Sequence, residues 1–227
     1  MKYLGIDLGG TNVAAAVVDE EGAILGKVSL PTPRGAEAVA DQMAAASRAA
    51  VEAAELSMDE IASVGIGSPG AIDPETGVVK YWSNLDFRDV PLAEMMTKRL
   101  GKEIYLENDA NAAAFGEYIA GGAKGYRDAV IITLGTGIGS GIILNGKILR
   151  GFNFAAGEMG HNVIVKDGIQ CTCGRKGCWE RYASASALTR ETKKAMQENK
   201  NTIMWQMTQD IDHVNAKLAF DAAAKGD

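Results

Sequence analysis

The sequence predicts an α/β protein in which a mixed sheet carries helices on its faces. Three observations support this fold class. Strand-like segments at 2–8, 12–19 and 22–30 are joined by short Gly-containing turns, which is the pattern of an antiparallel meander. Residues 36–56 are Ala-rich and contain neither Pro nor Gly, which favours a helix. The short apolar run 61–67 has the length and composition of a buried strand.

The remainder of the chain continues this alternation around further Gly-rich turns. We expect helices at 90–100, 109–120, 184–199 and 214–224, and strands at 103–106, 130–134 and 141–144. Gly121 and Gly122 end the helix at 109–120 and mark an expected boundary between two lobes, residues 1–120 and 121–227. Beyond Leu144 no long strand is expected, so the second lobe is expected to be incomplete.

Composition and charge narrow the classes of function. The 227 residues are 47% hydrophobic, which is enough for a buried core. The net charge of −6 argues against a nucleic-acid surface, which needs clustered Lys and Arg. No apolar run approaches the roughly 18 residues of a membrane span, and the chain opens on a strand-like segment rather than a signal peptide. We therefore expect a cytoplasmic protein with no nucleic-acid or membrane partner.

Two Gly-rich turns, each between two strand-like segments, have the pattern of phosphate-binding loops. Glycine lets backbone N–H groups approach phosphate oxygens, and an Asp at a strand end is suited to hold Mg²⁺ through water. The second turn leads into a strand rather than a helix, which excludes a dinucleotide-binding motif. An ordinary hairpin explains either turn alone, but the pair favours two turns that grip one triphosphate. The candidate phosphate-binding residues are Asp7, Gly9, Gly10, Thr11, Thr136 and Gly137.

A carboxylate stands where an apolar strand gives way to a helix, in the segment Glu107-Asn108-Asp109. Phosphoryl transfer to a hydroxyl group needs a base that accepts its proton, and Asp109 can perform this role. Asn108 beside it is suited to bind a second hydroxyl. The alternative is that Asn108 or Asp109 only caps the helix, which explains the pair equally well. The sequence leaves both interpretations open.

The cysteines all lie in one short segment that follows a histidine. One His and three Cys form a ligand set typical of structural zinc, although these spacings are not those of zinc fingers. Gly174 and Gly177 allow the backbone to fold tightly around an ion, whereas chance clustering of buried thiols is the alternative. Glu158 and Glu180 flank the segment and are suited to sugar hydroxyls. The expected zinc ligands are His161, Cys171, Cys173 and Cys178.

Together these segments resemble the ROK family of repressors and sugar kinases, which includes bacterial glucokinases. The resemblance covers nearly the whole chain, and its motifs occur in the family's order. The residues that carry it are Asp7–Thr11, Trp82–Leu85, Glu107–Ala113, Leu134–Gly139, Gly157–His161 and Cys171–Glu180.

The resemblance implies an actin-like (ribonuclease H-like) fold of two lobes around a cleft, and ATP-dependent phosphorylation of glucose to glucose 6-phosphate with Mg²⁺. Asp109 matches the catalytic base that deprotonates the sugar 6-hydroxyl. His161 matches a residue that serves both the zinc ion and the sugar. A homodimer is also implied. Family members continue for several tens of residues, so this chain resembles a C-terminally truncated member. The matching sugar-binding positions are Gly70, Asn108, Asp109, Glu158, His161 and Glu180.

Three alternatives remain at this stage. The substrate of the kinase can be another aldohexose, such as N-acetylmannosamine or mannose. The chain can be a non-catalytic sugar-binding module or fragment. It can also resemble the family's regulators, but these carry an N-terminal helix-turn-helix, for which a first strand that starts at Lys2 leaves no room.

Overall fold

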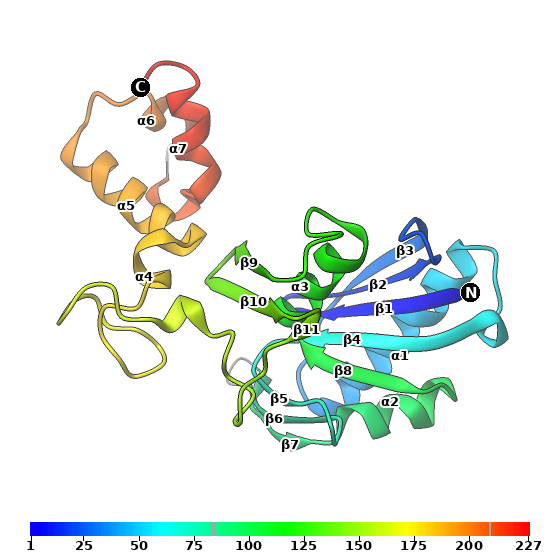
Figure 1. Ribbon diagram of the computed structural model, residues 1–227. Coiled ribbons are helices and arrows are strands. Elements are labelled where there is room, and N and C mark those ends of the chain that lie inside the picture. Colours follow the sequence, from blue (N-terminus) through cyan, green and yellow to red (C-terminus); the bar gives the residue numbers. More distant parts are fainter. Residues whose placement is uncertain (83–84, 209) are drawn as a thin grey trace. The chain divides into compact units, whose positions relative to one another are not determined.

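The structure, a computed structural model, describes residues 1–82, 85–208 and 210–227 (Figure 1). Ser83 and Asn84, which belong to one of the motifs named above, lie outside the described residues. The chain divides into two compact units. The first comprises residues 1–131 and 141–157, and the second comprises residues 132–140 and 158–227.

A five-stranded mixed sheet forms the centre of the first unit, with strand order β3-β2-β1-β4-β8. β1 pairs antiparallel with β2, and β2 with β3, so the predicted meander is confirmed. β4 runs parallel to β1, and β8 runs parallel to β4. The carboxyl ends of β1, β4 and β8 therefore meet at one edge of the sheet, where α/β proteins bind ligands. The strands are β1 (Lys2–Leu8), β2 (Asn12–Val18), β3 (Ile24–Pro31), β4 (Ile61–Ser68) and β8 (Ile104–Asn108).

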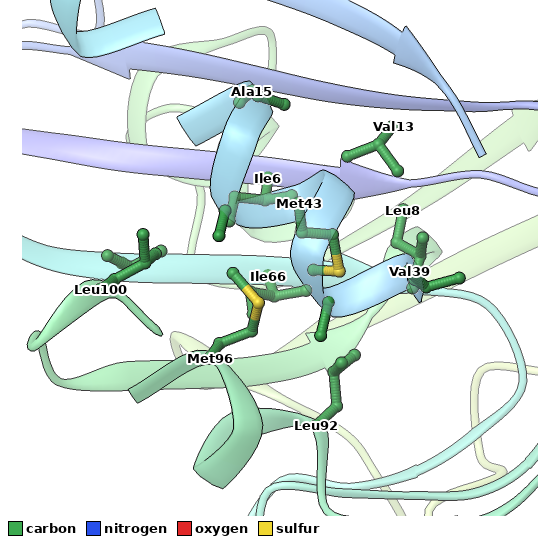
Figure 2. Close-up of a cluster of buried hydrophobic side chains, with 14 of the residues drawn as sticks. Ile6, Leu8, Val13, Ala15, Val39, Met43, Ile66, Leu92, Met96 and Leu100 are labelled. Atoms are coloured by element: carbon green, nitrogen blue, oxygen red, sulfur yellow. The ribbon is translucent and has the colours of Figure 1, made fainter. Parts of the chain in front are cut away.

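The main core lies on one face of this sheet, under two helices (Figure 2). Burial alternates along β1 with the period of two that a strand imposes, so Ile6 is buried whereas Asp7 is exposed. Met43 and Met96, from the two helices, are fully buried in the same cluster as Ile6 and Ile66. The helices are α1 (Ala36–Ala53) and α2 (Leu92–Leu100).

A third helix, α3 (Asp109–Ala120), packs on the opposite face of the sheet. Gly67 shows this, because its neighbour Ile66 in β4 is buried in the main core and Gly67 faces the other way. A Cβ atom on Gly67 would lie 3.5 Å from Asp109 Cα and from Ala112 Cβ. The sheet therefore touches α3 at the helix's first turn, and the predicted bounds of this helix are confirmed.

A small antiparallel sheet with the order β5-β6-β7 follows β4, and the sequence analysis did not predict it. Its strands are short, and the edge-to-face packing of Trp82 on Phe87, with ring centroids 5.7 Å apart, stabilises their pairing. Val90 belongs to the last of these strands, so the helix predicted at 90–100 begins later, after Pro91. The strands are β5 (Ala71–Asp73), β6 (Val78–Trp82) and β7 (Phe87–Val90).

Two other predicted boundaries, one of a helix and one of a strand, are wrong by about three residues. α1 ends at Ala53 rather than at residue 56, because Glu55 adopts a left-handed φ of 57°. The Leu56 N–H then donates to the Val51 carbonyl at 3.1 Å and closes the helix. The strand predicted at 141–144 begins earlier, at Ile138, so the second Gly-rich turn is tighter than expected.

The second Gly-rich turn joins β9 (Ala129–Leu134) to β10 (Ile138–Leu144), as the first joins β1 to β2. Both turns are therefore strand–turn–strand elements, as their sequence similarity indicates. The chain passes from the first unit to the second within β9 and returns within β10. The short strand β11 (Lys147–Ile148) completes the sheet order β11-β10-β9.

Beyond β11 the described residues form helices and loops without a further named strand, in keeping with the sequence prediction. A small apolar cluster of Met196, Val214 and Leu218 holds the last helices together. The α-helices are α4 (Glu180–Ala183), α5 (Ala185–Glu198), α6 (Met204–Met207) and α7 (Ala216–Ala223). The 3₁₀ helices of the chain include η1 (Met58–Glu60), η3 (Met159–His161) and η4 (Ile211–His213). Within residues 1–82, 85–208 and 210–227, every helix is too short or too polar to span a membrane.

Candidate functional site

The junction between β8 and α3 places Asp109 at the carboxyl edge of the main sheet. Asn108 is the N-cap, and its Oδ1 atom accepts hydrogen bonds from the backbone N–H groups of Ala110 at 3.0 Å and Asn111 at 3.1 Å. Its Nδ2 atom lies 3.5 Å from the Gly70 carbonyl, at the limit for a hydrogen bond. Capping by Asn108 thus accounts for this residue, and Asp109 is left as the first residue of the helix.

Asp109 is partly buried and lies near the carboxylate of Asp7. In the strand register, Asp7 of β1 pairs with Gly67 of β4, and Gly67 pairs with Glu107 of β8, so these positions line up across the sheet. Burial raises the pKa of Asp109, and the negative charge of Asp7 raises it further, against a 2.8 Å hydrogen bond from the Ala110 N–H that lowers it. Asp109 is therefore a stronger base than an ordinary carboxylate.

Glu107 anchors the same junction, a role that the sequence analysis missed. Its Oε1 atom accepts from the Asn108 backbone N–H at 3.0 Å and from the Asn111 side chain at 3.2 Å. Its Oε2 atom accepts from Arg150 at 2.6 and 2.7 Å, a charge-assisted pair. Asn111 is 4% exposed, and its Oδ1 atom has no partner among the described residues. Glu107 thus fixes the backbone that presents Asp109.

The first Gly-rich turn follows β1 at the same sheet edge. The Gly9 N–H donates to the Asn12 carbonyl at 2.9 Å, so this N–H group closes the turn itself. Thr32 braces it from the next segment, because its hydroxyl donates to the Gly9 carbonyl at 2.7 Å. Gly10 and Thr11 are exposed at the tip. The structure thus leaves the tip, rather than Gly9, as the part of the turn suited to phosphate.

In the second unit, one His and three Cys side chains converge. Their ligand atoms, on His161, Cys171, Cys173 and Cys178, all lie within 4.8 Å of one another. The Cys173 and Cys178 sulfurs are 3.6 Å apart, and His161 Nδ1 lies 3.5 Å from Cys171 Sγ. A tetrahedral zinc ion at about 2.3 Å from each sulfur requires sulfurs about 3.8 Å apart, so this donor set fits zinc.

The thiols of this cluster differ in acidity. Burial raises the pKa of Cys171 to about 12. Burial also opposes ionisation of Cys173, but hydrogen bonds from the Arg175 backbone and side chain outweigh it and lower the Cys173 pKa to about 6. A thiolate at Cys173 is the form that ligates a metal, and a bound cation would draw the proton from Cys171 as well.

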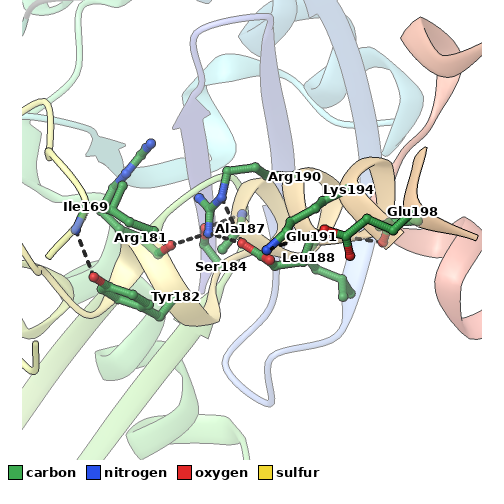
Figure 3. A network of polar contacts seen from close by, with 11 residues as sticks. Ile169, Arg181, Tyr182, Ser184, Ala187, Leu188, Arg190, Glu191, Lys194 and Glu198 are labelled. Atoms are coloured by element: carbon green, nitrogen blue, oxygen red, sulfur yellow. Dashed lines mark hydrogen bonds and ion pairs between the residues drawn. The ribbon is translucent and has the colours of Figure 1, made fainter. Parts of the chain in front are cut away.

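The loop that carries the cysteines is folded tightly and tied to the helices that follow. Gly177, at a φ of 82°, lies so close to the Val165 carbonyl that any side chain at 177 would collide with it. The Ile169 N–H donates to the Tyr182 hydroxyl at 2.8 Å, which ties the loop to α4 (Figure 3). Arg190 of α5 donates to the Arg181 carbonyl at 2.8 Å and links the two helices. The predicted tight turn is confirmed.

Glu180, the first residue of α4, lies between the cysteine cluster and the second Gly-rich turn. Its Oε1 atom accepts from Cys171 Sγ at 3.1 Å and lies 3.8 Å from His161 Nδ1. Its Oε2 atom faces Gly137, because a Cβ atom on Gly137 would lie 2.6 Å from it. The expected sugar-binding and phosphate-binding residues of this unit thus include a direct contact.

The structure therefore groups the candidate residues into two sets, one in each unit, and their roles remain predictions. Within the second unit, Glu158 precedes η3 and His161 ends it. The first set is Asp7, Gly9, Gly10, Thr11, Gly70, Asn108 and Asp109. The second set is Thr136, Gly137, Glu158, His161, Glu180 and the three cysteines.

Replacing Asp109→Asn should raise the free energy of unfolding at neutral pH. Ionised Asp109 is disfavoured in the folded state, so the stability it contributes is fully present below the unfolded-state pKa and is lost as pH rises towards the raised folded-state pKa. The amide of the variant does not titrate, and its oxygen still accepts the Ala110 N–H. The gain should disappear below about pH 3, where the carboxyl group is protonated in both the folded and the unfolded state. Urea unfolding at several pH values measures it.

The exposed Glu52 of α1 provides the control, since surface substitutions such as Glu52→Gln usually change the free energy of unfolding little. A stability gain for Asp109→Asn that does not depend on pH would contradict the assignment of a raised pKa to Asp109.

Comparison with known proteins identifies the family. The family model described as "ROK family" matches residues 3–225. A glucokinase from Streptomyces coelicolor is 48% identical over 190 residues, which cover 84% of this chain and 58% of that protein. A glucokinase from Thermotoga maritima is 39% identical over 230 residues, which cover all of this chain and 71% of that protein. This chain thus spans less than two thirds of the Streptomyces coelicolor relative.

A solved structure gives the fold. The crystal structure of a ROK family glucokinase from Streptomyces griseus in complex with glucose and AMPPNP is 40% identical to this chain, with a TM-score of 0.88. The match covers all of this chain and 72% of that one. The α/β arrangement is therefore that of the actin-like ROK kinases, as the sequence predicted. The chain belongs to the ROK family.

Proposed function

We propose that this chain carries the residues of an ATP-dependent sugar kinase that converts glucose to glucose 6-phosphate. The observation that carries the proposal is Asp109, a partly buried carboxylate of raised pKa at the ligand-binding edge of the parallel strands. The named relatives are glucokinases, and one was solved with glucose and AMPPNP, which favours glucose among the aldohexoses and ATP as the donor.

The chemical step needs one base and good alignment. The Asp109 carboxylate accepts the proton of the sugar 6-hydroxyl as its oxygen forms a bond to the γ-phosphorus of ATP. The bond between that phosphorus and the β,γ-bridging oxygen breaks, and ADP leaves with the electron pair. The raised pKa of Asp109 strengthens it as a base, while Glu107 and the Asn108 cap fix the backbone from which it projects.

Each of the two Gly-rich turns is suited to bind phosphate groups of ATP in this proposal. Gly10 and Thr11 at the exposed tip of the first turn, and Thr136 and Gly137 in the second, supply backbone N–H and hydroxyl donors. Mg²⁺ bound with ATP would neutralise charge on the phosphates, and Asp7, near the end of β1, would hold it through water. Without a metal ion, the negative charge of Asp7 also raises the pKa of Asp109.

Each of the two sets contains polar groups that are suited to bind sugar hydroxyls. Asn108 and the Gly70 backbone act from the first unit, and Glu158, His161 and Glu180 act from the second. Carboxylates accept hydrogen bonds from sugar hydroxyls. The Oδ1 atom of Asn108 already accepts the hydrogen bonds of the helix cap, so this residue offers its Nδ2 group to the sugar as a donor. Thus the two sets offer complementary acceptors and donors.

Zinc would be held by His161, Cys171, Cys173 and Cys178, and its role would be structural. Four protein ligands leave no position for a reacting water. Cys171 would give up the proton that it donates to Glu180, so the Glu180 carboxylate would be free to accept a hydrogen bond from the sugar.

We also propose the two lobes 1–120 and 121–227 and the cytoplasmic location that the sequence pattern predicts, and the homodimer that the resemblance implies.

Replacing Asp109→Asn should lower kcat for glucose phosphorylation by about 100-fold or more, because the variant cannot accept the proton. Glucose affinity should change little, since the amide is the same size and retains hydrogen-bonding groups. A coupled assay of ADP release and calorimetry with glucose measure the two quantities.

Glu52→Gln on the exposed face of α1 is the matched acid-to-amide control and should leave kcat unchanged. Near-normal turnover in Asp109→Asn would remove this residue from the role of base. Absence of glucose phosphorylation by the unsubstituted protein would contradict the proposed function itself.

Elemental analysis should find about one zinc ion per chain, and Cys173→Ser should lose it, because a hydroxyl replaces a thiolate ligand. Amide hydrogen exchange should then become faster between residues 158 and 180, and glucose affinity should fall. Lys176→Ala, an exposed change on the same loop, should keep the zinc. If metal-free protein binds glucose as tightly as the zinc-loaded protein, zinc does not organise the sugar site.

A further inference from the structure

The contact between Glu180 and Gly137 links two parts of the second unit that the sequence analysis treated separately. A Cβ atom on Gly137 would lie 2.6 Å from Glu180 Oε2 and 3.7 Å from its Cδ atom. Real Cβ atoms do not approach an oxygen so closely. The carboxylate of Glu180 therefore occupies the space that any side chain at 137 would need.

Steric fit, rather than backbone conformation, explains glycine at this position. Gly137 is absent from the glycines of the described chain that adopt a left-handed φ, so an L-residue can adopt its backbone conformation. Gly135, two residues earlier in the same turn, also lacks a left-handed φ, and its Cβ atom would meet no atom within 4 Å. The space around the two glycines thus differs, because Glu180 fills the position of a Cβ atom at Gly137 and no atom fills it at Gly135.

The backbones on both sides of this contact are braced. The Gly135 N–H donates to the Gly137 carbonyl at 3.0 Å, and the Ala185 N–H donates to the Gly135 carbonyl at 2.9 Å, which ties the turn to the start of α5. A Cβ on Gly160 would collide with the Ile138 carbonyl oxygen, so η3 also packs directly on the end of the turn. The two hydrogen bonds hold the turn together and against the start of α5.

The cysteine cluster borders Glu180 on its other side. Its Oε1 atom accepts from Cys171 Sγ at 3.1 Å, and its side chain is only 16% exposed. A methyl group at 137 would therefore push the flexible end of Glu180 and leave the braced backbones in place. The fold should tolerate the change, and the carboxylate should move.

We propose that Gly137 is a positioning residue for the sugar. Because Gly137 has no side chain, the Glu180 carboxylate can lie where it accepts a hydrogen bond from a hydroxyl of the hexose. This role rests on the proposed function and adds to it, because Gly137 was assigned only to phosphate. One glycine of the phosphate turn thereby sets the affinity for the sugar even when no nucleotide is bound.

The test is glucose binding without nucleotide, measured by calorimetry on Gly137→Ala and Gly135→Ala. Glucose affinity should fall about tenfold in Gly137→Ala, since a displaced carboxylate loses one charge-assisted hydrogen bond. Gly135→Ala, the matched control in the same turn, should keep the affinity of the unsubstituted protein. A phosphate-only role for Gly137 predicts no change in either variant, and that result would overturn the inference.

A double variant tests whether the effect of residue 137 on glucose affinity passes through Glu180. Glu180→Asp shortens the side chain, so adding Gly137→Ala to it should cost less glucose affinity than Gly137→Ala costs alone. If the two changes simply add, the effect of residue 137 does not pass through Glu180 and the inference fails. The same comparison decides the case if Gly137→Ala alone folds poorly.

A crystal structure of Gly137→Ala distinguishes failure of this inference from failure of the proposed function. Displacement of Glu180, with weaker glucose binding, supports the positioning role. An unmoved Glu180 overturns it, whatever the sugar affinity. If the unsubstituted protein does not bind glucose at all, the proposed function and the sugar role of Gly137 both fall, even where the displacement is seen.

Discussion

The parallel register of β1, β4 and β8 is the constraint on which the first unit depends. It aligns Asp7, Gly67 and Glu107 across the sheet, and the first turn of α3 lies against Gly67 at the sheet edge. Asp109, the first residue of α3, lies at this edge, where burial and the charge of Asp7 raise its pKa. The same packing that builds the fold thus makes the carboxylate basic.

The second unit obtains its order from close backbone packing and polar ties rather than from a sheet. Gly177 touches the Val165 carbonyl, and Tyr182 ties the cysteine loop to α4 (Figure 3). Glu180 stands at the meeting point, with Cys171 on one side and Gly137 on the other. A metal ion at the cluster would therefore act on Glu180 and Gly137 through a few short contacts.

Local patterns predicted much of this arrangement. The meander, the helix from Asp109 to Ala120 and the convergence of His161 with the cysteines follow from turn residues, an N-cap and ligand chemistry within short segments. What the sequence did not reveal depends on non-local packing. β5 to β7 need Trp82 on Phe87, Glu107 meets Arg150 from a distant segment, and Gly137 is explained only by Glu180. Neither spacing nor periodicity encodes these pairs.

The central claim is that Asp109 acts as the base on a hexose hydroxyl. A crystal structure of the unsubstituted protein with glucose tests it most directly. The account predicts a carboxylate oxygen of Asp109 within about 2.6–3.2 Å of the 6-hydroxyl. Glucose bound away from Asp109, or bound with its 6-hydroxyl directed elsewhere, would contradict the account.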